Sequence, residues 1–104
     1  MSNVHVVAII TAKPGQRTAL LDAFQANVPN VLAEDGCIEY QATVDAEGGG
    51  AIQARFGDDT FVVVEKWASM EHLKAHAAAP HMAAYAAKAK DMIADRFIHI
   101  LSPV

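Results

Sequence analysis

The chain has 104 residues, the usual size of one folded unit, and we expect a single domain over residues 1–104. Its 8 basic and 12 acidic side chains give a formal charge of −4, which disfavours nucleic acid and anionic membranes as partners. The only cysteine, Cys37, excludes an internal disulfide. The first residues lack the basic and apolar regions of a signal peptide, and no apolar run could span a bilayer, so we expect a cytoplasmic protein.

The N-terminal part of the chain changes from a strand pattern to a helix pattern and back. Residues 3–12 are β-branched and apolar on both faces, which predicts a central strand. From residue 16, apolar side chains recur every three or four positions and predict a helix, which Pro29 should kink or split and Gly36 should end. The apolar stripe of this helix comprises Leu20, Leu21, Phe24, Val28, Val31 and Leu32. Residues 37–45 alternate and predict the second strand.

Glycine-rich sequence separates the second predicted strand from the third. Residues 46–59 contain two glycine clusters, and we expect a flexible connection with a short strand over residues 51–55. No Gly-Lys-Ser/Thr follows the triple glycine, so the cluster does not indicate a phosphate loop. Residues 60–68 then alternate with period two and predict a strand. One face of that strand comprises Phe61, Val63, Glu65 and Trp67.

A capped helix, an interruption and a final strand complete the pattern. Ser69 is a typical helix cap, Pro80 interrupts the helix, and residues 96–101 form the last strand. The second helical segment has a stripe of Met82, Tyr85, Ala86, Ala89 and Ile93. The order β-α-β-β-α-β predicts an α+β, ferredoxin-like fold in which helices cover one face of an antiparallel sheet. Because 53% of the residues are hydrophobic and the other face also needs cover, we expect a homodimer.

Histidines cluster around the third predicted strand. Glu65 and Trp67 share one face of it, and the following helical segments carry His72, His76 and His81. A carboxylate on an inward face is costly without a partner, so Glu65 and His76 form a candidate general-base pair in which the carboxylate fixes the imidazole tautomer. Structural roles stay open beside this one, namely an ion pair for Glu65 and core packing for Trp67.

A metal site is a weaker alternative. His72 and His76 are spaced four residues apart, as helical zinc ligands are, and His81 or Glu65 would complete the set. Leu73 stands where the zinc-binding HExxH motif requires glutamate, so we expect no metal.

The remaining polar candidates carry less information. Cys37 begins a strand, where no helix dipole activates a thiol, so a cysteine–histidine catalytic pair is a minor alternative. His5 and His99 belong to the first and last strands, which should be neighbours, and we expect them on a face of the sheet. No GxGxxG motif follows the first strand, so no dinucleotide cofactor is indicated.

Five short motifs, together with the order of the elements, resemble the antibiotic biosynthesis monooxygenase domain. The similarity is greatest to its small bacterial quinol monooxygenase-like members. The motifs are residues 13–15, 34–40, 61–67, 73–76 and 80–82. The resemblance implies a dimeric α+β barrel of ferredoxin-like subunits. It also implies oxidation of a quinol-like or phenolic small molecule by O2 without a cofactor, since an electron-rich phenolate can pass an electron to O2 itself.

The resemblance also implies roles for particular side chains. His76 would be the base, Glu65 its orienting partner, and Trp67 and Phe61 the rings that stack on the substrate. Tyr40 matches the tyrosine of the family's Gly-Cys-x-x-Tyr motif and would line the pocket. We add His81 and Tyr85, which share a helix face, as substrate-binding candidates.

Two related activities fit the sequence less well. Haem-degrading relatives use an asparagine on the first strand, where this chain has only apolar side chains at residues 7–10. A relative that isomerises a phosphorylated signal needs a cationic clamp, and Lys66, Arg55 and Lys74 form no obvious cluster. An isomerase or lyase with the same His/Glu pocket, or a non-catalytic small-molecule-binding stress-response barrel, are the alternative functions.

Overall fold

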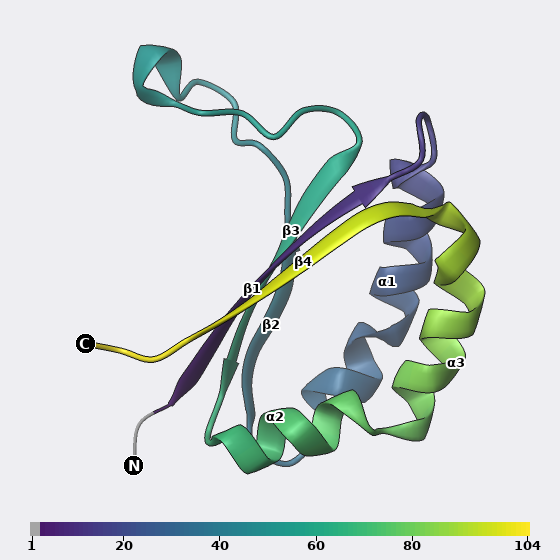
Figure 1. Ribbon diagram of the computed structural model, residues 1–104, viewed down its shortest axis with the longest axis vertical. Helices are drawn as coiled ribbons and strands as arrows, with labels where there is room; N and C mark the ends of the chain where they lie inside the picture. The colour runs from purple at the N-terminus through teal and green to yellow at the C-terminus, as the bar shows by residue number, and fades with distance from the viewer. Residues whose placement is uncertain (1–2) are drawn as a thin grey trace.

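One antiparallel sheet with helices on a single face forms the molecule (Figure 1). The computed structural model describes residues 3–104; Met1 and Ser2, which belong to the predicted domain, lie outside the described residues. The strand order is β2-β3-β1-β4, which confirms the predicted ferredoxin-like α+β fold. The elements are β1 (Val4–Ala12), α1 (Arg17–Leu32), β2 (Cys37–Thr43), β3 (Thr60–Trp67), α2 (Met70–Ala77), α3 (Pro80–Ala89) and β4 (Ile93–Leu101), with short 3-10 turns at Gly50–Ile52 and Lys90–Met92.

The two central strands, β1 and β3, place the core. They pair antiparallel, with Val7 opposite Val64 and Val4 opposite Trp67. Because side chains alternate across a strand, every second residue of each strand faces the helices and is buried. The buried core comprises Val4, Val6, Ala8, Ile10, Ala12, Leu20, Phe24, Val31, Tyr40, Phe61, Val63, Trp67, Leu73 and Ala89. The predicted central position of β1 is therefore confirmed.

The first helix follows its predicted apolar stripe and departs from the prediction near its C-terminal end. Pro29 lies inside one helix and does not split it, because the helix ends three residues later and little of the backbone ladder remains to be broken. Leu32, predicted on the buried stripe, is 52% exposed at that end. Gly36 is not the residue that ends the helix, since Ala33 is the cap. With φ of +81°, it forms the turn into β2, where a Cβ would overlap the His72 ring.

The second helical region is divided at Pro80, as predicted. The Ser69 hydroxyl accepts the His72 backbone N–H at 3.3 Å and caps α2, and Pro80 occupies the first turn of α3. Ile93 was predicted on the helix stripe but begins β4, three residues before the predicted strand. It pairs with Ala12 of β1, and this sheet pairing outweighs the helical spacing.

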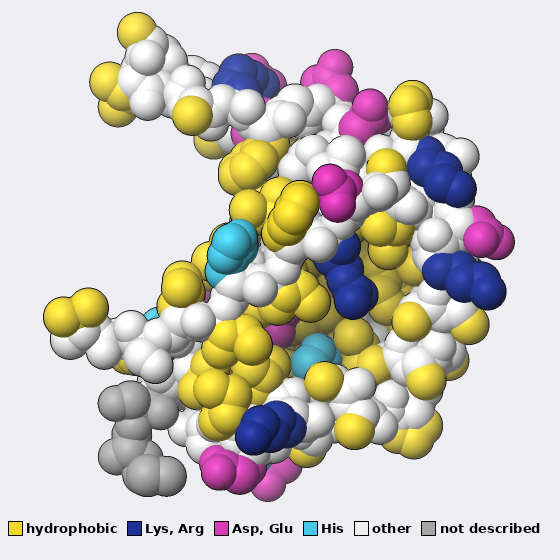
Figure 2. Space-filling model, viewed as in Figure 1, with side chains coloured by type: hydrophobic (Ala, Val, Ile, Leu, Met, Phe, Trp, Pro, Cys, Tyr) yellow, Lys and Arg dark blue, Asp and Glu magenta, His cyan; other side chains and the backbone are white. Residues whose placement is uncertain are grey.

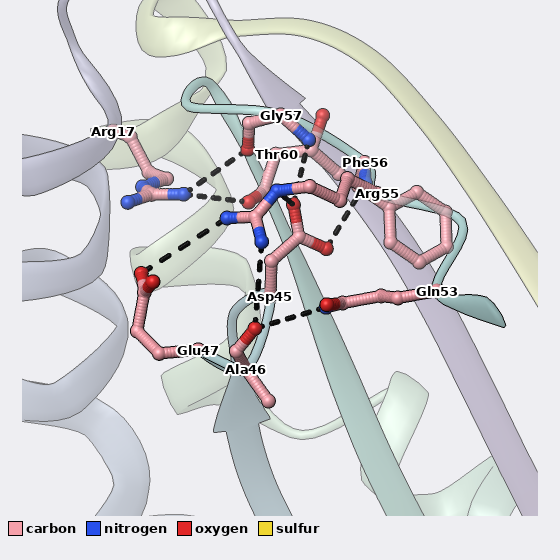
Figure 3. A network of polar contacts seen from close by, with 9 residues as sticks. All are labelled: Arg17, Asp45, Ala46, Glu47, Gln53, Arg55, Phe56, Gly57 and Thr60. Carbon is pink, nitrogen blue, oxygen red and sulfur yellow. Dashed lines mark hydrogen bonds and ion pairs between the residues drawn. The ribbon is translucent and has the colours of Figure 1, made fainter. Parts of the chain in front are cut away.

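The connection between β2 and β3 extends away from the body of the molecule (Figure 1). We refer to residues 44–59 as the arm. The short strand predicted over residues 51–55 is wrong, because this part of the arm contains the 3-10 turn Gly50–Ile52. Polar contacts link the two sides of the arm (Figure 3). Asp45 accepts the backbone N–H groups of Phe56 at 3.0 Å and Gly57 at 2.9 Å, and Arg17 of α1 donates to the Thr60 carbonyl at 3.1 Å.

The stability of the arm at low pH should depend on whether the Asp45 carboxylate is charged. Its two backbone hydrogen bonds, above all the one from Gly57, lower its pKa below the ordinary value. Its stabilising effect is therefore present above the unfolded-state pKa of about 3.9 and is lost as pH falls through the lower folded value. We expect the Phe56 and Gly57 amide signals in NMR spectra to stay constant from pH 7 to about 4 and to move only below that. Asp45→Asn, which retains one acceptor oxygen, should remove this transition and speed amide exchange at Gly57. A transition above pH 4.5 in the native protein would contradict the assignment.

The last strand leaves much apolar surface uncovered. Phe97, Ile98, Ile100 and Leu101 of β4 are each between 47% and 55% exposed. In Figure 1 the helices lie on one side of the sheet only, so the other side has no cover within the subunit. Phe97 and Leu101, opposite Ile9 and His5, lie on this uncovered side, where the predicted homodimer would place its second copy. No helix within residues 3–104 is long and apolar enough to cross a membrane.

Candidate functional site

A carboxylate between two imidazoles is the centre of the candidate site. His76 of α2 bonds through Nδ1 to Glu34 Oε2 at 2.8 Å, and the His81 Nε2 of α3 lies 3.0 Å from the same oxygen. The His76 side chain is only 6% exposed and that of Glu34 16%. An imidazole with one nitrogen held by a carboxylate has a fixed tautomer, and its other nitrogen can act as a base.

Glu34 is a candidate site residue that reasoning from the sequence missed. It lies in the turn between α1 and β2, far from the histidines along the chain. Cys37, the first residue of β2, pairs with Trp67, and the Ala68 N–H donates to the Gly36 carbonyl at 2.8 Å. These contacts bring the turn to the start of α2. The signal in the sequence was the motif at residues 34–40, which contains Glu34 but does not indicate its partner.

Glu65 is buried, as predicted, but has a different hydrogen-bond partner from the predicted one. Its Oε1 accepts the indole N–H of Trp67 at 2.9 Å. Glu34, and not Glu65 as predicted, is hydrogen-bonded to His76. The two residues are neighbours on one face of β3, so their side chains meet locally. Burial raises the pKa of the Glu65 carboxyl, and the Trp67 hydrogen bond and the nearby His76 oppose this rise. Glu65 is thus held by the indole N–H of Trp67, and the nearby His76 favours the charged form of this carboxyl.

Aromatic rings surround His76. The rings of Trp67 and His76 have centroids 4.6 Å apart and are tilted by 34°, and Tyr40 meets His76 edge-on at 5.4 Å. Phe24 of α1 stacks on Tyr40 at 5.3 Å and contacts Phe61 at 5.7 Å. Trp67 and Phe61 have no exposed surface in this subunit, so neither ring has a free face for a substrate. They form the packed wall behind His76.

Two predicted substrate-binding residues carry unpaired polar atoms. Within residues 3–104, the Tyr85 hydroxyl and both ring nitrogens of His81 are buried without a hydrogen-bond partner, so the 3.0 Å approach of His81 Nε2 to Glu34 is a close charge contact and not a hydrogen bond. Each buried polar atom without a partner lowers the stability of the fold by roughly 1–3 kcal/mol, and a bound ligand that supplies a partner would remove this cost. Burial raises the pKa of Tyr85, although the Arg96 guanidinium partly opposes the rise, so the hydroxyl is a neutral donor at neutral pH.

Two cavities lie away from the His76–Glu34 pair. The cavity of about 250 Å³ at the base of the arm is lined by residues that include Phe61, and the one of about 230 Å³ between α1 and α3 includes His81 and Tyr85. Neither is lined by His76. Figure 2 shows a separate hollow between β4 and the helices, with mainly hydrophobic walls and with histidine, acidic and basic side chains visible inside it.

The other candidate residues point elsewhere. His72 contacts Ser69 and Asp35, with Nε2 3.5 Å from the Asp35 carboxylate, so it diverges from His76. Within the described part of the chain, no group of three or more His, Cys, Asp or Glu side chains is arranged to hold a metal ion.

The remaining cysteine and histidines do not join the cluster either. Burial, together with the carboxylates of Glu34 and Glu65, raises the pKa of the Cys37 thiol, which therefore lacks the activation that a nucleophile needs. His99 lies opposite Val7 on neighbouring strands, as predicted, and His5 shares that helix-free face.

The fold and the buried carboxylate–imidazole pair are those of a small α+β protein, and the sequence comparison relates this protein to enzymes. The sequence profile of the family described as "Antibiotic biosynthesis monooxygenase" matches residues 3–88, so the chain belongs to this family. It is 42% identical over 100 residues to the Escherichia coli K12 protein named "Probable quinol monooxygenase YgiN", covering 94% of this chain and 95% of that protein. Family and relative together support a monooxygenase.

Solved structures show the same fold. The structure of Rv0793 from Mycobacterium tuberculosis matches with a TM-score of 0.80 and 27% identity, covering 99% of this chain and 96% of that one. The crystal structure of PA3566 from Pseudomonas aeruginosa matches with a TM-score of 0.83 and 24% identity, covering 100% and 96%. Because PA3566 is only 24% identical to this chain, the similarity between the two proteins establishes the fold alone.

Proposed function

We propose that this monooxygenase oxidises a quinol-like or phenolic small molecule with O2 and without a cofactor. The observation that carries the proposal is the buried His76–Glu34 pair at 2.8 Å, packed against Trp67. A phenol becomes able to reduce O2 once its proton is removed, so a held imidazole in a water-poor, aromatic environment supplies what the reaction needs from the protein. The name of the 42% identical relative supports the quinol class.

In the proposed reaction His76 accepts the phenolic proton on Nε2 while Nδ1 stays bonded to Glu34. The substrate then supplies the electrons itself. For a simple hydroquinone, one atom of O2 enters the ring to give a hydroxyquinone, and the other leaves as water with two of the substrate's hydrogens. We propose that the substrate enters through the hollow shown in Figure 2 and that the unpaired Tyr85 hydroxyl donates to a substrate oxygen.

We also propose that the working form is a homodimer. A second copy packed on the helix-free face would cover Phe97 and Leu101 of β4, which are 55% and 47% exposed in one subunit and lie opposite Ile9 and His5 of β1. Light scattering coupled to size-exclusion chromatography should give twice the subunit mass. A single-subunit mass at micromolar concentration would contradict the dimer.

Oxygen consumption tests the proposed reaction directly. Protein shown by absorbance and elemental analysis to hold no flavin or metal should consume O2 with a panel of hydroquinones, and it should not do so with their dimethyl ethers, which have no phenolic proton. Product that forms equally well without O2 would indicate an isomerase or lyase. Ligand-dependent thermal stabilisation with no turnover would indicate a binding protein. Either result would overturn the proposed oxidation.

A further inference from the structure

The last strand, β4, carries an arginine on the side of the sheet that faces the helices. Arg96 lies opposite Ile10 of β1, and Ile10 is buried on the helix side, so the two side chains point to the same side of the sheet. The Arg96 residue is exposed. Among the polar contacts of residues 3–104 it takes part only through its backbone N–H, which donates to Asp95. Its guanidinium is therefore a cation available to a ligand.

The same side of β4 forms one wall of the hollow in Figure 2. Ile98 and Ile100 lie opposite Ala8 and Val6 of β1. Both isoleucines are 51% exposed, whereas Ala8 and Val6 are 4% and 2% exposed, so the helices cover β1 and leave β4 open. Arg96 continues the row of Ile98 and Ile100 and therefore borders the hollow between β4 and the helices, inside which basic side chains are visible (Figure 2).

The Tyr85 hydroxyl of α3 lies near this guanidinium. Burial raises the pKa of Tyr85, and the Arg96 charge partly opposes the rise, which requires the two groups to be close. Within residues 3–104 the hydroxyl is buried without a partner, and at neutral pH it is a donor. A guanidinium and a hydroxyl that both lack an acceptor form a pair of donors suited to a carboxylate.

The acidic groups lie at the other end of the site, beside His76. Glu34 is bonded to His76, and Glu65 lies close to it. Glu65 and Ile100 lie opposite the same residue of β1, and Arg96 is about 13 Å further along β4 from that row. A carboxylate on a substrate would be repelled by Glu34 and Glu65 and attracted by Arg96. This charge distribution would turn the other end of the substrate towards His76.

We propose that Arg96 and the Tyr85 hydroxyl bind a carboxylate at the end of the substrate remote from its phenolic oxygen. The inference rests on the proposed function, because it names the class of molecule that the same site oxidises. That class is an aromatic acid and not a neutral quinol. The arginine side chain spans part of the distance to His76, and the part that remains suits two fused rings. The carboxylate is not changed in the reaction and only fixes which end of the molecule reaches the base.

Binding of a ligand that cannot be oxidised tests this subsite without turnover. Naphthalene-2-carboxylate should bind roughly 10-fold or more tightly than naphthalene-2-carboxamide, which has the same shape and no charge. Arg96→Gln should remove the preference, and Arg96→Lys, which keeps the charge, should restore part of it. Arg55→Gln is the matched control and should keep the preference, because Arg55 pairs with Asp45 in the arm. Calorimetric titration measures all four proteins.

Two results of this titration would overturn the subsite. One is equal binding of the acid and the amide by the native protein. The other is a preference that survives in Arg96→Gln and is lost in Lys88→Gln, since Lys88 lines the α1–α3 cavity together with Tyr85. That second result would place the anion in the α1–α3 cavity and not in the hollow.

Oxygen uptake separates the subsite from the proposed oxidation. The quinol 5,8-dihydroxynaphthalene-2-carboxylate should be oxidised with a lower KM than its carboxamide. Arg96→Gln should raise the KM for the acid roughly 10-fold with little change in kcat, because the carboxylate is bound equally before and during the reaction. Oxidation of both quinols with equal KM would overturn the subsite and leave the oxidation standing. Selective binding of naphthalene-2-carboxylate by a protein that consumes no O2 would overturn the oxidation and leave the subsite standing.

Discussion

Replacing His76 by glutamine should lower kcat for hydroquinone oxidation by roughly 10²–10⁴-fold, the usual contribution of a general base. Glutamine can keep a hydrogen bond to Glu34 but cannot accept the phenolic proton at neutral pH. The loss should shrink as pH rises towards the ordinary pKa of the phenol, because the substrate then arrives already ionised. Oxygen uptake measured from pH 6 to 10 checks both the size of the loss and this pH dependence.

In the same assay, substitutions of the two carboxylates near His76 should lower kcat to different extents. Glu34→Gln removes the charge that is bonded to the imidazole and should lower kcat strongly, whereas Glu65→Gln keeps an acceptor for Trp67 and should lower it less. His72→Gln should match the native enzyme, since it lies one turn away on the same helix and contacts Asp35. A larger loss in Glu65→Gln than in Glu34→Gln would mean that the originally predicted pair performs the chemistry. An active His76→Gln would remove His76 from the role of base.

The fold was predictable because its determinants are periodic. Alternation in residues 60–67 and helical spacing from residue 17 reflect the geometry of a strand and a helix, and neither depends on distant contacts. The predictions from the sequence differ from the structure where contacts between residues far apart in the chain determine the local structure. Ile93 joins β4 because it can pair with Ala12, and the arm is ordered through the Asp45 carboxylate reaching across to Phe56 and Gly57. No local pattern carries that information.

The candidate site was predictable in part for the same reason. Glu65 and Trp67 meet because they are two residues apart on one strand, a relation that can be read from spacing. Glu34 meets His76 across 42 positions of the chain, only because the turn before β2 closes against α2. A buried histidine indicates that some carboxylate is near, but the choice between Glu65 and Glu34 required the three-dimensional arrangement. The sequence motif pointed to the right segment without giving it a role.

Trp67, through its buried ring and its hydrogen bond to Glu65, makes the largest predicted contribution to stability. Trp67→Ala should lower the free energy of unfolding by about 3–5 kcal/mol, because a fully buried ring is removed from the core. Trp67→Phe keeps most of the ring but leaves Glu65 without its donor, which should cost about 1–3 kcal/mol. Urea unfolding followed by circular dichroism measures both variants.

The pH dependence of that loss separates packing from charge. Burial places the folded pKa of Glu65 above its unfolded value of about 4.3, so the buried group favours folding most at pH below that value, and stability falls as pH rises through the folded pKa. The Trp67 hydrogen bond limits this fall because it favours the charged form. The deficit of Trp67→Phe should therefore grow between pH 4 and pH 8. Adding Glu65→Gln should remove the growth, because glutamine does not ionise. A deficit that is constant with pH would show that only the volume of the indole ring stabilises the fold, and that the carboxylate behind His76 has another source of support.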